Sequence, residues 1–263
     1  MIDIFSLNGK VVLITGAAGY LGSAMAEGLA LAGATVYLNG RNEKNIEEIV
    51  RKLTAKGMNV KPAIFDVTER DEIIQFLDNI EGDTLDIIIN NAYAGIAGTV
   101  ETASAENYES SYNISLIATH NLVQLALPYL RMAKTTNGDA CVINIASMYG
   151  MVSPDLRIYD SKEGSNPPFY GAAKAALIQW TKYAACEFAE EGIRFNSISP
   201  GAFPAKHVQT ENKPLVSKIV NKIPMARIGQ PEDLVGPVLF LASSAANYVT
   251  AVNLPVDGGW TAW

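Results

Sequence analysis

The sequence is poor in cysteine, in positive charge and in long apolar runs, and each shortage excludes a class of protein. Only Cys141 and Cys186 are present, too few for a disulfide-stapled secreted domain, and we expect both to be small buried thiols of a cytoplasmic protein. The formal net charge of -7 leaves no basic footprint for a nucleic acid. No apolar run approaches the roughly 20 residues of a membrane span, and the opening MIDIFSLNGK lacks the pattern of a signal peptide. No cluster of His, Cys and carboxylate residues has metal-ligand spacing, so we predict no bound metal.

What the chain does contain is a regular alternation of short apolar runs and helical patterns. Continuous apolar strands separated by helices are typical of a parallel sheet that is covered on both faces. A length of 263 residues suits one such domain, so we predict a single α/β domain over 1–263, a doubly wound parallel sheet of the Rossmann type. We expect strands at 10–15, 35–38, 60–65, 85–90, 140–146, 193–198 and 252–256, and helices at 20–31, 43–55, 69–79, 104–132, 169–190 and 231–243.

Two segments, 152–168 and 201–214, show neither pattern. Long irregular loops inside a compact domain are usually functional or disordered. The sequence leaves both interpretations open for these segments.

A glycine-rich turn joins the first expected strand to the first helix, Thr15-Gly16-Ala17-Ala18-Gly19-Tyr20-Leu21-Gly22. An open α/β sheet binds dinucleotides at this place, because glycines let the backbone approach the pyrophosphate and the helix N-terminus offers it free N–H groups. We therefore predict cofactor contacts from Gly16, Ala18, Gly19, Tyr20, Leu21 and Gly22. A glycine trio alone is also compatible with a purely structural turn.

The end of the second strand bears on the choice of cofactor. An NAD enzyme usually carries Asp or Glu here for the ribose 2′-hydroxyl, but this chain has Gly40 followed by Arg41. A guanidinium can bind a 2′-phosphate through two parallel hydrogen bonds. Arg41 therefore favours NADP, while NAD and a merely solvated surface arginine stay open as alternatives.

Several ordered motifs resemble the short-chain dehydrogenase/reductase family over nearly the whole chain. Besides the glycine turn they are Asp66-Val67, Asn90-Asn91-Ala92 with Tyr93 in place of the family's glycine, Asn113, Ser147, Tyr170-x-x-x-Lys174, Pro200-Gly201 and Val256-Asp257-Gly258-Gly259. The resemblance implies an NAD(P)-dependent oxidoreductase with Asn113, Ser147, Tyr170 and Lys174 as its catalytic residues. It also implies cofactor contacts from Asp66, Val67, Asn91, Ala92, Tyr170, Lys174, Pro200 and Gly201, with Phe203 packing on the nicotinamide near Ala205, where the compact branch often has a threonine.

The catalytic pair has a chemistry of its own. Tyr170 and Lys174 lie four positions apart, so a helix places them on one face. A free tyrosine titrates near pH ~10, and a nearby ammonium would lower that pKa. We predict Tyr170 as the acid/base, while the resemblance gives Ser147 the substrate oxygen and Asn113 a water that links Lys174 to solvent. In isolation, Tyr170 and Lys174 would be an ordinary surface pair on a helix.

The segment between Ser147 and Tyr170 is longer than in the compact branch of the family. It contains Pro154, Asp155, Arg157, Tyr159, Asp160, Lys162, Glu163 and Asn166. A polar wall beside the catalytic pair suits a hydroxylated or phosphorylated substrate, with Arg157 and Lys162 as candidate phosphate contacts, although a surface loop without a ligand role is the alternative. The segment and the glycine spacing resemble the extended, nucleotide-sugar branch, and the chain also resembles oxidoreductases of bacterial sugar and flagellin-glycan modification.

Three functions follow from these features. The first is the interconversion of a ketone and a secondary alcohol on a small sugar-like, sugar-phosphate or nucleotide-sugar substrate. The second is a 3-ketoacyl-type or general carbonyl reductase, which Pro224-Met225-Ala226-Arg227-Ile228-Gly229 resembles. The third is a non-catalytic dinucleotide-binding scaffold, and the complete set of four catalytic residue types argues against it.

The resemblance further implies a homotetramer or homodimer, built on the helices at 104–132 and 169–190. The chain ends in the apolar segment Trp260-Thr261-Ala262-Trp263. A free tail would expose two indole rings to water, so we predict that this segment packs against a neighbouring subunit.

Overall fold

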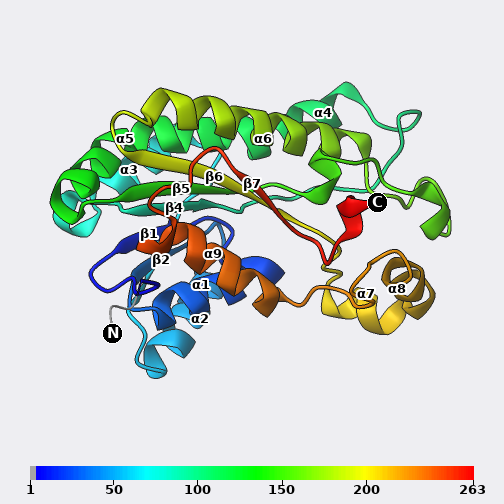
Figure 1. The fold of residues 1–263 in the computed structure, drawn as a ribbon, viewed down its shortest axis with the longest axis horizontal. Helices are drawn as coiled ribbons and strands as arrows, with labels where there is room; N and C mark the ends of the chain where they lie inside the picture. Colours follow the sequence, from blue (N-terminus) through cyan, green and yellow to red (C-terminus); the bar gives the residue numbers. More distant parts are fainter. Residues whose placement is uncertain (1–3) are drawn as a thin grey trace.

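Within residues 4–263, which the computed structural model describes, seven parallel strands form one sheet (Figure 1). The strand order is β3-β2-β1-β4-β5-β6-β7, so the chain winds outward from β1 and then crosses back to β4. This order confirms the doubly wound sheet and the single domain predicted from the sequence. The strands are β1 (Val11–Ile14), β2 (Thr35–Gly40), β3 (Val60–Ile64), β4 (Ile87–Asn90), β5 (Ala140–Ile145), β6 (Ile193–Pro200) and β7 (Asn253–Val256).

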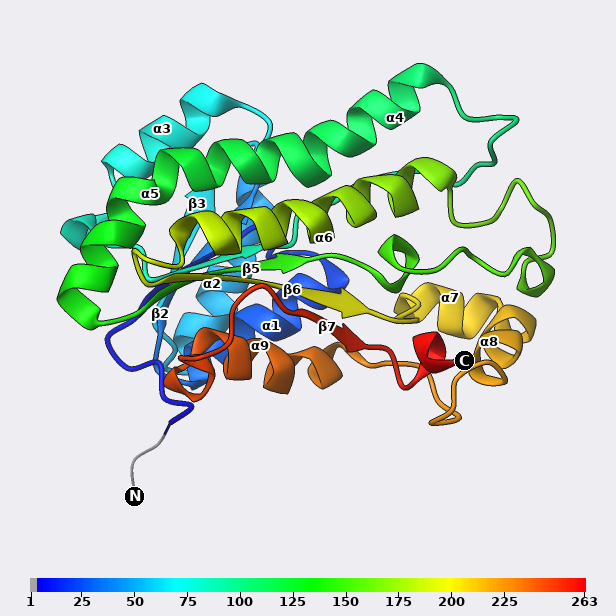
Figure 2. The same ribbon diagram turned by 45° about the horizontal axis from the view of Figure 1, so that its top comes forward.

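Helices cover both faces of the sheet, and their apolar sides build two cores. One face carries α1 (Tyr20–Leu31), α2 (Glu43–Ala55) and α9 (Val235–Ala242) (Figures 1 and 2). The other face carries α3 (Arg70–Asp78), α4 (Ala105–Tyr112), α5 (Ala118–Asn137) and α6 (Pro168–Phe188). Two short helices, α7 (Lys206–Glu211) and α8 (Lys213–Val220), lie near the carboxyl end of β6, close to the C-terminus.

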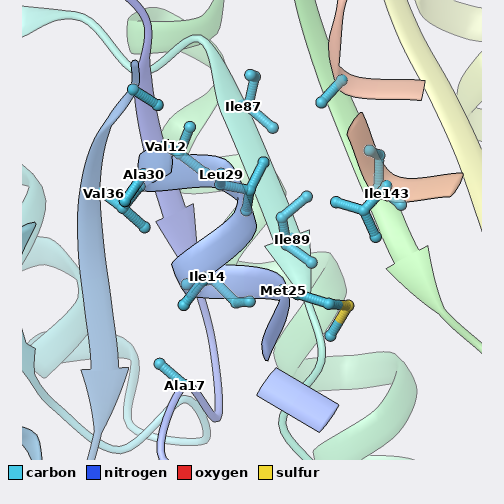
Figure 3. Close-up of a cluster of buried hydrophobic side chains, with 14 of the residues drawn as sticks. Val12, Ile14, Ala17, Met25, Leu29, Ala30, Val36, Ile87, Ile89 and Ile143 are labelled. Atoms are coloured by element: carbon cyan, nitrogen blue, oxygen red, sulfur yellow. The ribbon is translucent and has the colours of Figure 1, made fainter. Parts of the chain in front are cut away.

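The core explains why the central strands are almost purely apolar. Met25 and Leu29 of α1 pack over Ile14 and Ile89, all of them fully buried (Figure 3). On the other face of the same strands, Leu13 and Ile88 are equally buried beneath α3 and α5. Burial on both faces of a strand requires a continuous apolar run, which is the pattern that the sequence displays.

The helices at 20–31 and 43–55 have the predicted bounds, but three other regions differ from the prediction. The long helix expected at 104–132 is interrupted by a π-helical turn, Asn113–Ile117, and runs on to Asn137. Segment 201–214 contains α7 and the start of α8 instead of irregular chain. The helix expected at 231–243 divides into a 3-10 turn, Pro231–Leu234, and α9.

One prediction about a single residue is wrong. Cys186 is exposed, because it lies on the outer side of α6, while Cys141 is fully buried in β5. Trp260 is buried by its own chain, where it joins a small apolar cluster with Ile158, Ile219 and Ile223, so the predicted packing of the terminal segment against a neighbouring subunit now rests on Trp263. Trp263 remains 82% exposed, although its indole N–H donates to the Lys222 carbonyl oxygen.

None of the helices within residues 4–263 is both long enough and apolar enough to cross a membrane. The described residues also contain no group of three or more His, Cys, Asp or Glu side chains that could hold a metal ion.

Candidate functional site

The carboxyl ends of β1, β4, β5 and β6 meet at one edge of the sheet, where the strand order reverses between β1 and β4. In open α/β sheets, ligands bind at such a reversal. The loops that leave these strands carry the glycine turn, Asn91, Ser147 and Gly201. The topology therefore brings together residues that lie far apart in the sequence.

Close packing explains two of the three glycines in the turn. Gly16 has a φ of +64°, and a Cβ there would lie 2.9 Å from the Cα of Ala92. A Cβ at Gly22 would lie 2.8 Å from the Asn91 side-chain nitrogen and would collide with the Gly16 carbonyl. Gly19 is the N-cap of α1 and has no side chain to cap it. The first-turn N–H groups of α1, from Tyr20, Leu21 and Gly22, therefore have neither a helical partner nor a side-chain cap, which fits a phosphate group.

Asn91 holds this turn against β4. Its side-chain nitrogen donates to the carbonyl oxygens of Thr15 (2.9 Å) and Gly16 (3.1 Å). The Thr15 hydroxyl oxygen in turn accepts from the backbone N–H groups of Asn91 (2.9 Å) and Ala92 (3.0 Å). The four bonds make a rigid floor for the site, and they give Thr15 a structural role that the sequence did not reveal.

A cleft of about 370 Å³ opens beside the turn. Six of the residues predicted for the cofactor or for catalysis line it: Gly16, Arg41, Asp66, Val67, Ala92 and Asn113. Asn39, Thr68, Tyr93 and Ser110 line it as well, without having been predicted as contacts. The cleft thus joins the glycine turn to the ends of β2 and β3, as an extended dinucleotide requires.

Arg41 and Asp66 face each other at the end of this cleft. An Arg41 guanidinium nitrogen lies 3.3 Å from an Asp66 carboxylate oxygen, and the arginine side chain is 69% exposed. Burial pushes the pKa of Asp66 upward, but hydrogen bonds from Thr68 and from Arg41 outweigh it, and the pKa lies below its usual value. The carboxylate is therefore charged and holds Arg41 at the mouth of the cleft.

Phe203 does not line the cleft beside the glycine turn. It lines a second pocket of about 540 Å³ together with Met225, Arg227 and Asp257. Its ring packs so closely on Gly229 that a Cβ there would lie 2.5 Å from it. Pro200 ends β6, and a Cβ at Gly201 would lie 2.5 Å from the Asp257 Cα, so the family's Pro-Gly pair fits against the end of β7.

The predicted catalytic residues come from three elements. Pro168 opens α6, so Tyr170 and Lys174 lie on its first turns, while Ser147 lies two residues after the end of β5. Lys174 is 3% exposed, and its ammonium donates to the Ile145 carbonyl oxygen at 2.8 Å. Asn113 begins the π-helical turn, in which its carbonyl oxygen accepts from the Ala118 N–H. Such turns often mark functional sites in helices, but helical periodicity gives no warning of them.

The pKa shifts of Tyr170 and Lys174 differ from the prediction. Burial raises the pKa of Tyr170, and its hydrogen bond with Ser147 offsets only part of this. Burial likewise lowers the pKa of Lys174 to about 8. The lysine nitrogen lies 5.8 Å from the centre of the Tyr170 ring and points to the Ile145 carbonyl. Among the protein's own groups, desolvation therefore dominates over the expected lowering of the Tyr170 pKa by Lys174.

Tyr93, the residue in the family's glycine position, contacts this pair. Its ring meets the Tyr170 ring edge to face at a centroid distance of 4.8 Å, and the Lys174 nitrogen lies 5.3 Å from its centre. Burial raises the pKa of Tyr93. The site thus contains a second phenol beside Tyr170, which the sequence indicated only as a departure from the family's glycine.

The segment between Ser147 and Tyr170 is packed against α8. Asp155 binds the Arg157 guanidinium through two oxygens, at 2.8 and 2.9 Å, and it also pairs with Lys222. The Tyr159 hydroxyl lies 3.1 Å from the Tyr149 hydroxyl. Arg157 is therefore already bound to a carboxylate, which weakens its case as a phosphate contact, while Lys162 is exposed and has no ion-pair partner within residues 4–263.

Comparisons with known proteins agree with this geometry. Residues 16–261 match a family model described as enoyl-(acyl carrier protein) reductase. The chain is 34% identical over 260 residues to a tropinone reductase homolog from Arabidopsis thaliana, covering 98% of this chain and 91% of that protein. It is 31% identical over 255 residues to a 3-oxoacyl-(acyl-carrier-protein) reductase from Thermotoga maritima, covering 96% of this chain and 98% of that protein. The crystal structure of a gluconate 5-dehydrogenase from Burkholderia cenocepacia, in complex with NADP and tartrate, superposes with a TM-score of 0.88 at 28% identity, covering 99% of this chain and 98% of that one. The chain is therefore an enzyme of the short-chain dehydrogenase/reductase family.

Proposed function

We propose that the protein interconverts a ketone and a secondary alcohol on a small hydroxylated, sugar-like substrate, with NADP(H) as its cofactor. The observation that carries the substrate class is the polar segment 152–168, whose Tyr159 hydroxyl lies 3.1 Å from the hydroxyl of Tyr149, two residues after Ser147. Arg41 at the mouth of the cleft supports NADP, and the gluconate 5-dehydrogenase similar to this chain binds NADP. A cytoplasmic location belongs to the same proposal, and the two free thiols favour it.

The chain's own residues have distinct tasks in this reaction. The nicotinamide ring, when bound, supplies or accepts the hydride. Tyr170, whose raised pKa keeps the phenol protonated at neutral pH, donates its proton to the carbonyl oxygen during reduction. The Ser147 hydroxyl donates a hydrogen bond to the same oxygen and stabilises the charge that develops there. Asn113, at the π-helical turn, has the task of linking Lys174 to solvent through a water.

A second candidate is a 3-ketoacyl-type or general carbonyl reductase. The observation in its favour is a buried apolar cluster that joins segment 152–168 to α8. It consists of Met148, Ile158, Ile219, Ile223 and Trp260. An apolar wall of this kind suits an acyl chain. The Thermotoga maritima relative carries the corresponding name.

The test is the oxidation of NADPH and NADH, followed by absorbance, with a panel of carbonyl compounds. The panel contains 5-keto-gluconate, keto-sugar phosphates, a nucleotide-linked keto-sugar, tropinone and an acetoacetyl thioester. Turnover of the sugar compounds with NADPH supports the proposal. Turnover of the thioester or tropinone alone would reject the sugar-like substrate and favour the second candidate.

The chemistry is tested separately with Tyr170→Phe. Removal of a general acid lowers kcat by roughly a hundredfold or more. Tyr183→Phe is the matched control, because Tyr183 lies on the same helix and is 70% exposed. If Tyr170→Phe turned over as fast as the control, the protein would be a dinucleotide-binding scaffold or would use another acid.

A further inference from the structure

Tyr93 holds a place in the loop after β4 where the family has a glycine, and the structure fixes its backbone firmly. Asn91 and Ala92, the two residues before it, are bound to Thr15 by the hydrogen bonds described above. The side chain therefore leaves the loop in a defined direction. It points toward α6, where its ring meets Tyr170, and it also lines the cleft.

The loop makes room for this ring at a second position. A Cβ at Gly95 would lie 2.5 Å from the Tyr93 hydroxyl oxygen and 2.8 Å from its ring. Any other residue at 95 would displace the ring. The glycine that the motif lacks at 93 is thus present two residues later, where it permits the orientation of Tyr93.

The Tyr93 hydroxyl is connected to the backbone beside the catalytic tyrosine. It lies 3.3 Å from the Ser111 hydroxyl, and Ser111, which is 2% exposed, donates to the Phe169 carbonyl oxygen at 3.2 Å. A serine hydroxyl has a single proton. Since that proton goes to Phe169, Tyr93 must be the donor to Ser111. The chain of bonds ends on the residue directly before Tyr170.

Both ends of Tyr93 therefore act on the same catalytic group. The ring supports the Tyr170 ring from the side, in the edge-to-face arrangement that aromatic pairs prefer. The hydroxyl, through Ser111, fixes the first turn of α6 on which Tyr170 sits. Tyr93 also faces the Lys174 ammonium, whose charge is attracted by the face of an aromatic ring within about 6 Å.

We propose that Tyr93 is a positioning residue, which holds the Tyr170 ring in the orientation needed for proton transfer. The proposal rests on the oxidoreductase function proposed above and adds a residue to it. Tyr93 gives no proton to the substrate and acts only through Tyr170, whose ring it supports. The glycine of the family motif cannot perform this task, because it has no side chain.

The first test separates positioning from cofactor binding. Tyr93→Leu keeps an apolar side chain but removes the ring and the hydroxyl. We expect kcat on the best substrate of the panel to fall roughly tenfold or more, since small displacements of a catalytic group have effects of this size. The KM for NADPH should change by less than about threefold. A raised KM for NADPH with an unchanged kcat would overturn the proposal and make Tyr93 a wall of the cofactor cleft.

The second test uses the hydrogen-bond chain, and it stays informative even if Tyr93→Leu fails to fold. Tyr93→Phe breaks the bond to Ser111, whereas Ser111→Ala breaks that bond and the bond to Phe169. Ser111→Ala should therefore lose at least as large a fraction of kcat as Tyr93→Phe, and the double variant should lose no more than Ser111→Ala alone. Tyr93→Phe, which keeps the ring, should retain much more activity than Tyr93→Leu. Additive losses would show that Tyr93 and Ser111 act independently, contrary to the proposal.

Gly95→Ala tests the same contact by displacing the Tyr93 ring instead of removing it. It should lower kcat in the wild-type protein by displacing Tyr93, and it should cause no further loss in Tyr93→Leu, where the ring is absent. Equal losses in both backgrounds would show that Gly95 acts on the loop alone, and would count against the proposal.

A crystal structure of Tyr93→Leu tests the same idea without any substrate. We expect the Tyr170 ring to leave the position that it has in the wild-type protein. An unchanged Tyr170 ring would overturn the proposal even if no compound of the panel were turned over. Full turnover by Tyr170→Phe, in contrast, would remove the proposed function itself, so the two failures are distinguishable.

Discussion

Lys174 is a buried cation without a carboxylate partner among the described residues. Its contacts are the Ile145 carbonyl oxygen and the faces of two tyrosine rings. Burial lowers its pKa from 10.5 to about 8. Such an arrangement reduces the stability of the fold, because the ammonium must be taken out of water. We read this as a loss of stability that the active site requires.

Removal of this charge should stabilise the protein. The difference of about 2.5 between the two pKa values corresponds to roughly 3 kcal/mol of unfavourable free energy while the amine is charged. Lys174→Met should therefore raise the free energy of unfolding at neutral pH by about 1–3 kcal/mol, after the loss of the Ile145 hydrogen bond. Urea unfolding of both proteins measures this. The variant should at the same time be inactive.

The same pKa fixes the pH dependence of that difference. The folded pKa is lower than the unfolded one, so between pH 8 and pH 10.5 the unfolded chain holds a proton that the folded chain has lost. Stability contributed by Lys174 therefore rises with pH in this window. The advantage of Lys174→Met should be complete near pH 7 and much smaller near pH 10. An advantage that did not change with pH would contradict the assignment.

We predict that the choice between NADPH and NADH depends on Arg41. Its guanidinium is held at the mouth of the cleft by Asp66 and is mostly exposed. A charge-assisted bond to a 2′-phosphate is worth enough for about a tenfold effect on affinity. Arg41→Ala should weaken NADPH binding by that factor and leave NADH binding nearly unchanged, as measured by fluorescence titration. Arg51→Ala, an exposed arginine of α2, is the control. Equal losses for both cofactors would refute the role in 2′-phosphate recognition.

Single residues could be predicted from the sequence where a motif ties them to their neighbours along the chain. The glycine turn, Ser147 and the Tyr170–Lys174 pair belong to this kind. Tyr93 and Ser111 do not, because their contact depends on the packing of the loop after β4 against α4 and α6. Likewise, Gln209 donates to the Tyr20 hydroxyl oxygen at 3.1 Å across 189 positions of sequence, and no local pattern announces such a contact.

At the scale of elements, segment 152–168 and α8 form one unit. Asp155 joins Arg157 of the segment to Lys222, which follows α8, and its side chain is only 15% exposed. Hydrogen bonds from Arg157 and Lys222 hold the pKa of Asp155 well below its ordinary value of 3.8. A carboxyl group whose pKa is lowered in the folded state stabilises that state at every pH above its ordinary pKa. This stabilisation is lost only as the pH falls through the folded-state pKa, so the connection between segment 152–168 and α8 should survive mild acid.

Asp155→Asn should release the segment from α8. We expect faster hydrogen exchange over 152–168 and a KM for substrate that is raised about threefold to tenfold, with a smaller change in kcat. Asp160→Asn is the matched control, because Asp160 is 71% exposed and pairs with Lys218 at 3.5 Å, a geometry that contributes little. Equal behaviour of the two variants would mean that segment 152–168 does not shape the substrate site.

The elements themselves were predictable in proportion to their length and periodicity. The helix at 43–55 has a clear apolar face, the helix at 20–31 is apolar over most of its surface, and both end at residues that the sequence marks. By contrast, α7 and α8 contain six and eight residues, and short helices of this kind are formed by their tertiary contacts. The π-helical turn at Asn113 inserts one extra residue into a helix, which the apolar periodicity of 104–132 does not register.

At the scale of the whole molecule, apolar side chains remain on the surface. Trp263 is 82% exposed and Ile117 is 47% exposed. β7 is an edge strand of the sheet, so one of its sides has no strand beside it within residues 4–263. Monomeric proteins usually cover or interrupt such features. We therefore retain the homotetramer or homodimer as our prediction.

Light scattering on the purified protein decides this point, with a mass of two or four times 28.2 kDa as the expected result. Trp263 and Trp260 then offer a matched pair of variants. Trp263→Ser removes an exposed ring and should weaken assembly without unfolding the chain, whereas Trp260→Ser removes a ring that is 8% exposed within the cluster of Ile158, Ile219 and Ile223, and should lower stability by about 3 kcal/mol or more. A wild-type mass of 28.2 kDa at micromolar concentration would leave Trp263 as an ordinary exposed residue. An assembly unaffected by Trp263→Ser would place the subunit contacts on other surfaces, with the face around Ile117 as the next to be tested.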